Sequence, residues 1–127
     1  MANLIASVEE LSSLSILKLQ GKLNDSEAKS IIDIVNNLLD KNLIHVIMNF
    51  ENCSEVNNYG ISILISLIGA VNEKNGKIVF TNIDSNLEKK FKMMGLSSYV
   101  EFYNNDEAAL KKINMQDWFE VKNELYL

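Results

Sequence analysis

The chain contains few side chains that could carry covalent or acid–base chemistry. It has one cysteine, Cys53, and one histidine, His45. A catalytic thiol requires a base beside it, and the sequence does not show whether these two side chains meet. We predict instead that Cys53 packs at the end of a strand. His45 lies inside an apolar stretch, and we expect it to be a satisfied core or edge residue.

Motifs for other reactions and for cofactors are also missing from the sequence. No carboxylate pair has the spacing of a metal site, and no glycine-rich loop is followed by the lysine of a phosphate site. No serine lies in a nucleophile motif, and one cysteine cannot form an internal disulfide. We therefore predict a protein that is not an enzyme and that takes no metal or cofactor.

The residues best suited to recognition lie at positions 54–61, before and at the start of an apolar helical stretch. Asn57 or Asn58 could cap that helix by accepting hydrogen bonds from its free backbone N–H groups. Tyr59 is an aromatic anchor of the kind that is enriched in protein interfaces. We expect helix capping and partner contact to be combined in this segment.

The composition is that of one compact domain with a substantial core. The chain has 127 residues, of which 47% are hydrophobic and 23% charged. Its net charge of −5 argues against a nucleic-acid partner, because phosphate binding needs a basic surface. No apolar run reaches the ~18 residues of a membrane helix, and the N-terminus lacks the pattern of a signal peptide. We expect a cytoplasmic protein without membrane insertion.

The apolar pattern of the first half predicts a hairpin followed by a β-α-β unit. Strands are expected at residues 4–8 and 14–21, and their short connection indicates an antiparallel pair. Asn24 starts a capping-box pattern, which predicts a helix over about 25–41. The apolar run at 43–50 indicates a buried strand.

Helices and strands alternate in the second half as well. A polar loop at 51–57 is expected to lead into a helix at 59–75, with Gly76 just beyond its end. That helix is apolar on nearly all sides, so we expect it to be buried on nearly all sides. The remaining elements are a strand at 77–81, a helix from the capping pattern at Ser85 to Gly95, a strand at 98–103 and a last helix capped by Asn105.

This order predicts a single α/β domain over residues 1–114. Its sheet should be mixed and mostly parallel, with an opening β-hairpin and about four flanking helices. Residues 115–127 form an extension with several large apolar side chains, among them Trp118 and Phe119. We expect this extension to pack on the domain or on a partner.

Four short segments match, in order and at the right spacing, the motifs of one known protein family. Residues 19–24 (LQGKLN) are similar to the family's Gly-x-Leu-Asp strand end, with Asn24 where Asp is usual. Residues 47–50 resemble the central strand, and 56–61 (VNNYGI) stand where the family has Asp-Ser-Ser/Thr-Gly-Leu. Residues 91–96 (FKMMGL) resemble Phe-x-x-x-Gly-Leu. Together these segments resemble the STAS domain family, which includes the bacterial anti-sigma-factor antagonists, and the resemblance covers about residues 4–114.

The resemblance implies a switch at the start of the second helix. In typical anti-sigma-factor antagonists, a Ser or Thr there is phosphorylated by a partner kinase that is also the anti-sigma factor. The matching residue is Asn58, which has no hydroxyl and cannot take phosphate. A neutral Asn58 could hold the module in its binding-competent state, or it could mark a lost switch. Ser54 and Ser62 are alternative positions for a displaced phosphosite.

The resemblance further implies a protein partner that acts in transcription regulation. We predict a regulatory binding module for a kinase-type anti-sigma factor or a similar switch protein. The alternative is a constitutive scaffold or transporter-associated subunit, as in stressosomes or lipid-transport complexes, and a homodimer remains open. The residues predicted to contact the partner are Asn24, Ser54, Asn57, Asn58, Tyr59, Gly60 and Ile61.

Overall fold

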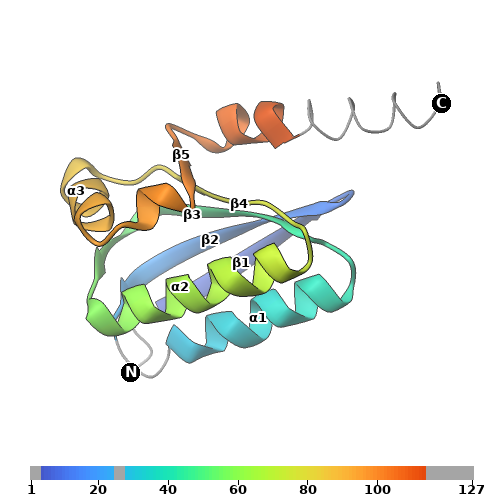
Figure 1. Cartoon of the computed structure of the whole chain (residues 1–127), viewed down its shortest axis with the longest axis horizontal. Coiled ribbons are helices and arrows are strands. Elements are labelled where there is room, and N and C mark those ends of the chain that lie inside the picture. The colour runs from blue at the N-terminus through green and yellow to red at the C-terminus, as the bar shows by residue number, and fades with distance from the viewer. Residues whose placement is uncertain (1–3, 25–27, 114–127) are drawn as a thin grey trace.

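Five strands form one mixed sheet in the computed structural model, which describes residues 4–24 and 28–113 (Figure 1). The strand order is β1-β2-β3-β4-β5, with β1 antiparallel to β2 and the other neighbours parallel. This confirms the predicted α/β fold and its opening hairpin. The strands are β1 (Leu4–Leu11), β2 (Leu14–Leu23), β3 (His45–Val56), β4 (Ile78–Thr81) and β5 (Glu101–Tyr103).

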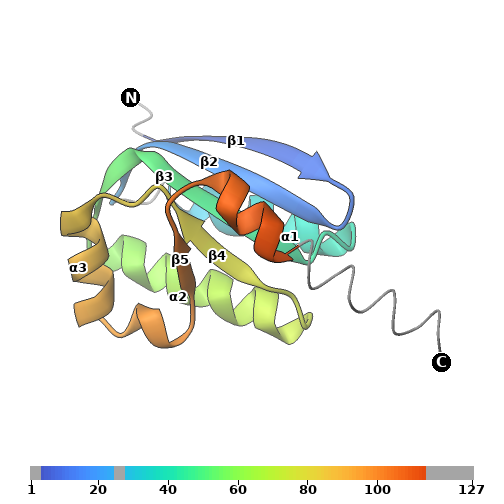
Figure 2. The ribbon, with the colours of Figure 1, turned by 90° about the horizontal axis from the view of Figure 1, so that it is seen from above.

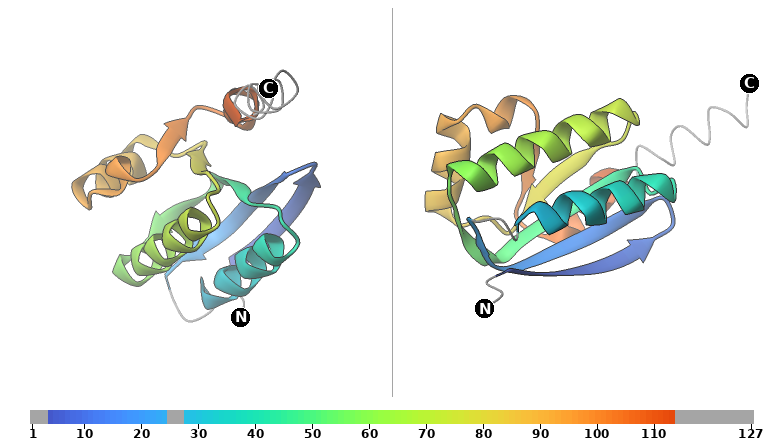
Figure 3. Two further views of the ribbon diagram at one scale, coloured as in Figure 1. Left: turned by 45° about the vertical axis from the view of Figure 1, so that its right-hand side comes forward. Right: turned by 90° about the horizontal axis from the view of Figure 1, so that it is seen from below.

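The helices lie on both faces of this sheet. Consecutive parallel strands joined by right-handed crossovers place their helices on one face, and α1 and α2 lie side by side there (Figure 3). A helical segment at residues 106–113 lies on the other face (Figure 2). The other helices are α1 (Lys29–Asp40), α2 (Asn58–Glu73), α3 (Ser85–Met93) and the short 3₁₀ helix η2 (Leu96–Ser98).

Each face of the sheet has its own hydrophobic core. The larger core lies under α1, α2 and α3 and contains Phe50, Phe80 and Phe91, whose ring centroids are 5.0 to 5.7 Å apart. The smaller core lies under the segment 106–113. It consists of Leu14, Ile16, Ile47, Val79, Ala109 and Ile113.

The prediction of a polar loop at 51–57 is wrong, because β3 continues as a strand to Val56. The continuation pairs with β2, at Gln20 with Asn52 and at Leu23 with Val56, and two register shifts interrupt the ladder. Polar side chains are acceptable here because backbone pairing, rather than an apolar pattern, holds the segment in the sheet. As a result, β3 ends directly at the start of α2.

Asn24 does not cap α1 as expected. The helix begins at Lys29, and the residue at its N-cap position, Ala28, makes no side-chain capping hydrogen bond. Asn24 instead lies directly after β2, four residues before Ala28. The capping-box pattern therefore predicts correctly that a helix follows, but it places the start of that helix too early.

The end of α2 also differs from the expectation. The left-handed residue after the helix is Asn75, with φ of 60°, rather than Gly76. Asparagine tolerates this conformation better than most residues. Gly76 is needed for another reason, because a Cβ atom there would lie 1.8 Å from the carbonyl oxygen of Ile44.

The last elements follow the predicted order with shifted limits. The cap of α3 is Asp84, one residue before the expected Ser85, and it accepts a hydrogen bond from the backbone N–H of Leu87 at 2.8 Å. Gly95 ends this region in a left-handed conformation, and η2 follows, so β5 starts only at Glu101. Asn105 caps the last helical segment as predicted. The extension at 115–127 lies outside the described residues.

Candidate functional site

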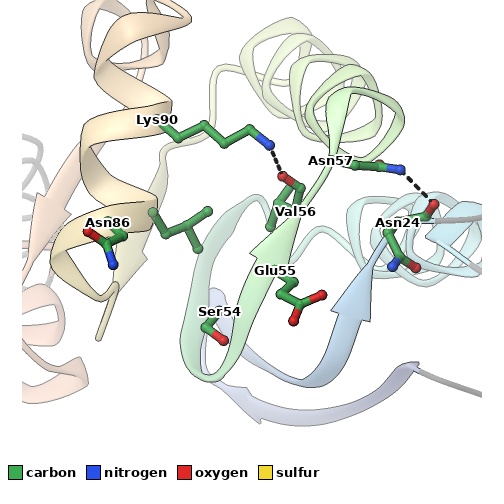
Figure 4. Close-up of a pocket in the computed structure, with 8 residues that line it drawn as sticks. Asn24, Ser54, Glu55, Val56, Asn57, Asn86 and Lys90 are labelled. Carbon is green, nitrogen blue, oxygen red and sulfur yellow. Dashed lines mark hydrogen bonds between the residues drawn. The ribbon is translucent and has the colours of Figure 1, made fainter.

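Asn57 anchors the start of α2 with its side chain. Its Oδ1 accepts a hydrogen bond from the backbone N–H of Gly60 at 2.9 Å, which is the predicted N-cap. Its Nδ2 donates to the carbonyl oxygen of Asn24 at 2.8 Å (Figure 4). One asparagine therefore caps α2 and ties it to the end of β2.

Gly60 allows α2 to approach β2 closely. A Cβ atom at this position would lie 2.0 Å from the carbonyl oxygen of Leu23 and 2.8 Å from a methyl group of Val56. The carbonyl oxygen of Leu23 belongs to the strand backbone, so it cannot give way to such a contact unless the end of β2 moves. Glycine is thus required here for space, and it brings the first turn of α2 against the ends of both strands.

Lys90 holds the same junction from the side of α3. Its ammonium group donates a hydrogen bond to the carbonyl oxygen of Val56, the residue before the cap (Figure 4). The contact joins residues 34 positions apart. The junction between β3 and α2 is therefore fixed by β2 on one side and by α3 on the other.

The predicted contact residues separate into exposed and buried ones. Ser54, Asn58 and Tyr59 are exposed, and Tyr59 keeps 36% of its surface accessible. Gly60 is buried and Ile61 is only 2% exposed, since Ile61 packs in the larger core. These two residues position the start of α2 rather than present a surface.

A cavity of about 370 Å³ opens beside this junction, between the end of β3 and α3 (Figure 4). It brings together three predicted residues, Asn24, Ser54 and Asn57, and adds Asn86 and Lys90, which sequence reasoning missed. No local sequence pattern indicates that Lys90 reaches Val56, because the two residues are 34 positions apart. The remaining lining residues are Glu55, Val56 and Leu87.

Cys53 and His45 do not form a catalytic pair. They are eight residues apart on β3, which corresponds to roughly 26 Å along an extended strand. Cys53 is fully buried, and desolvation raises the pKa of its thiol to about 11, so the reactive thiolate is disfavoured. His45 accepts a hydrogen bond at Nδ1 from the backbone N–H of Lys77 at 3.1 Å, as expected of a satisfied edge histidine.

Within the described ranges 4–24 and 28–113, no group of three or more His, Cys, Asp and Glu side chains could hold a metal ion. No helix in the same part of the chain is both long and apolar enough to cross a membrane. The residues at the start of α2 present amide groups, a hydroxyl group and one aromatic ring, which are groups that suit recognition.

Solved structures of several proteins share this architecture. An anti-sigma factor antagonist from Mycobacterium paratuberculosis is 12% identical, with a TM-score of 0.74 over 87% of this chain and 94% of that chain. The anti-sigma factor antagonist SpoIIAA in its unphosphorylated form is 15% identical, with a TM-score of 0.71 over 87% of this chain and 98% of that chain. The phosphorylated form of the Bacillus cell fate determinant SpoIIAA is 17% identical, with a TM-score of 0.68 over 84% of this chain and 98% of that chain.

At these identities the likeness to solved structures establishes the fold alone. The sequence itself carries the family assignment, because a family model described as the STAS domain matches residues 6–109. This match spans the sheet, α1, α2, α3 and the start of the last helical segment. The chain therefore belongs to the STAS domain family.

Proposed function

We propose that this chain is a non-catalytic, cytoplasmic regulatory module that binds a kinase-type anti-sigma factor or a similar switch protein. The exposed residues Ser54, Asn58 and Tyr59, with Asn24 and Asn57, form its contact surface. The single observation that carries the proposal is the exposure of Asn58 in the first turn of α2, directly after the anchored cap at Asn57. This is the position at which the family resemblance implies the phosphoacceptor.

The anchoring of this junction favours binding. Asn57 is held to the end of β2, and Val56 is held by Lys90 from α3. A surface that is ordered before binding loses less conformational entropy when the partner arrives. Tyr59 then supplies a rigid aromatic contact of the kind that dominates interface energies.

Asn58 makes the proposed binding independent of phosphorylation at this position. Phosphate on a serine would add nearly two negative charges to the interface. These charges would repel acidic groups of the partner and would have to lose their water on binding. Asparagine stays neutral at every physiological pH and cannot be modified in this way. The module would therefore bind its partner constitutively.

The experiment is an affinity capture from lysate of the source cells, read by mass spectrometry, with three bait proteins. Wild type and Asn58→Ala, which are both neutral at this position and cannot take phosphate, should capture the same kinase-type partner. Asn58→Asp should lose at least about tenfold in affinity, because its charge is left without a partner in the interface. Asn104→Asp is the matched control, since residue 104 is exposed and follows β5, away from α2. Equal capture by all baits would refute the assignment of the site.

A constitutive scaffold or transporter-associated subunit is the second candidate, and the missing hydroxyl at Asn58 favours it. A permanent subunit has no use for a phosphoswitch. Size-exclusion chromatography with light scattering on native complexes separates the two roles. A large assembly that survives Asn58→Asp supports the scaffold, whereas a monomer or small complex that Asn58→Asp disrupts supports the switch.

A further inference from the structure

An apolar groove lies between the outer side of α2 and the turn that follows α3, away from the proposed contact surface. Its volume is about 410 Å³. Much of its lining is open to solvent, since Ile65 is 53%, Met94 49% and Tyr99 69% exposed. We call it the α2–η2 groove. Its lining residues are Ile65, Ile68, Gly69, Asn72, Met94, Leu96 and Tyr99.

The exposure of this groove corrects the expectation that α2 is buried on nearly all sides. The helices α1, α2 and α3 form a single layer on their face of the sheet, so no further described element lies above the outer side of α2 (Figure 3). Met93, next to the groove, is 87% exposed. A cluster of exposed large apolar residues of this kind marks a surface that another segment or molecule covers.

Gly69 leaves the floor of the groove open. Glycine inside a helix costs stability relative to alanine. Here no neighbouring backbone requires it, because a Cβ atom at this position would meet nothing within 4 Å. Because Gly69 has no side chain, the backbone of α2 itself lines this part of the groove.

We propose that the C-terminal segment of this same chain, residues 114–127, docks in the α2–η2 groove. The segment has the right chemistry for an apolar groove with methionine and tyrosine in its walls. Aromatic rings pack favourably against methionine sulfur and against other rings. Its large apolar residues are Met115, Trp118, Phe119, Val121, Leu125, Tyr126 and Leu127.

The charges of the two surfaces are complementary. The segment carries three acidic side chains, Asp117, Glu120 and Glu124, against one lysine. The helix α3, which leads into Met94 of the groove, carries Lys89 and Lys92, and Lys92 also pairs with Glu88 at 3.9 Å. Docking of the segment would bring its carboxylates to this basic helix in a protein that is otherwise acidic.

The segment is long enough to reach the groove. It leaves the described chain at Ile113, which packs on the sheet face opposite α2. Its 14 residues can span about 46 Å when extended. A domain of this size has a radius of gyration of only about 13 Å. The edge to be crossed is β5, a strand of three residues that pairs with β4 beside η2.

The chain carries its own probe for this docking, because Trp118 is the only tryptophan. In the intact native protein, Trp118 emission should be blue-shifted relative to the urea-unfolded chain, and acrylamide should quench it weakly. The variant Gly69→Glu places a negative charge in the groove without removing any native side chain. In this variant, Trp118 emission should shift to longer wavelength, and quenching by acrylamide should rise several-fold.

Ser66→Glu is the matched control, since Ser66 is exposed on the same helix and does not line the groove. It should leave Trp118 emission unchanged. Circular dichroism of both variants checks that α2 stays folded. The emission should also stay constant on dilution, because the segment and the groove belong to one molecule.

Several outcomes would overturn the proposal. Trp118 emission in wild type that matches the unfolded chain would mean that the segment is undocked. A blue-shifted emission that Gly69→Glu does not change would place the segment elsewhere. A red shift on dilution would mean that a second copy supplies it. The docking needs no partner protein, so its failure is distinct from a failure of the proposed function.

Discussion

The carboxylate of Asp106 accepts a hydrogen bond from the hydroxyl of Thr81 at 2.6 Å and joins the last helical segment to the centre of the sheet. Its other oxygen accepts a hydrogen bond from Nδ2 of Asn49 at 3.0 Å. Thr81 is fully buried and Asn49 is 5% exposed. Three polar side chains from β3, β4 and the helical start thus satisfy one another at the edge of the smaller core.

Replacement of Asp106 by alanine should therefore destabilise the fold. The change leaves the hydroxyl of Thr81 and the amide of Asn49 buried without this acceptor, at a cost of about 1–3 kcal/mol. Urea unfolding followed by circular dichroism measures the change. The neighbouring exposed Glu107→Ala is the control and should stay within about 0.5 kcal/mol of wild type. Equal effects of the two substitutions would show that the cluster does not stabilise the protein.

Two glycines of α2 should respond in opposite ways to alanine. Gly60→Ala drives a methyl group into the carbonyl oxygen of Leu23 and should cost about 1–3 kcal/mol or more. Gly69→Ala meets open space and should stabilise the protein by about 0.8–1 kcal/mol through higher helix propensity. Thermal and urea unfolding of both variants test this. A stabilising Gly60→Ala would contradict the close approach of α2 to β2.

Asn58→Asp should slightly raise the stability of the free protein. No acidic residue lies in the first turn of α2, so the new carboxylate meets the positive end of the helix dipole and gains about 0.3–1 kcal/mol. The gain should shrink at high salt, because the site is exposed. Urea unfolding at low and high ionic strength measures both effects. A stabilised variant that no longer binds its partner would show that binding is lost through charge and not through unfolding.

The thiol of Cys53 should be unreactive in the folded protein. Burial raises its pKa from an ordinary value near 9 to about 11, and alkylating reagents attack the thiolate. Alkylation by iodoacetamide at pH 8 should therefore be slow in buffer and fast in urea. Rapid modification of the native protein would mean that the end of β3 opens in solution.

The raised pKa of Cys53 also sets the sign of a pH effect on stability. The folded state favours the protonated thiol, so this contribution is complete below about pH 9 and falls as the pH rises toward about 11. The stability difference between wild type and Cys53→Ala should shrink over this interval. An unchanged difference from pH 8 to pH 11 would contradict the shift.

The local pattern of the chain determined the element order and several helix ends. The apolar stripe of α1 predicted a helix packed on one side, and its buried residues are Ile31, Val35, Leu38 and Leu39. Asn57, Gly95 and Asn105 mark helix ends as predicted, since a cap acts on groups within four residues of itself. The order of the elements, with the family resemblance, was enough to predict the mixed sheet.

Only the tertiary structure decided what depends on contacts between distant residues. Polar residues 51–56 became strand because β2 offered pairing groups, and Lys90 reached Val56 across 34 positions. Within residues 4–24 and 28–113, no element lies over the outer side of α2, which leaves Ile65 53% exposed although the helix is apolar almost all round. Helix and cap preferences depend on residues that are close in the sequence, whereas strand pairing and burial depend on which distant segments the fold brings together.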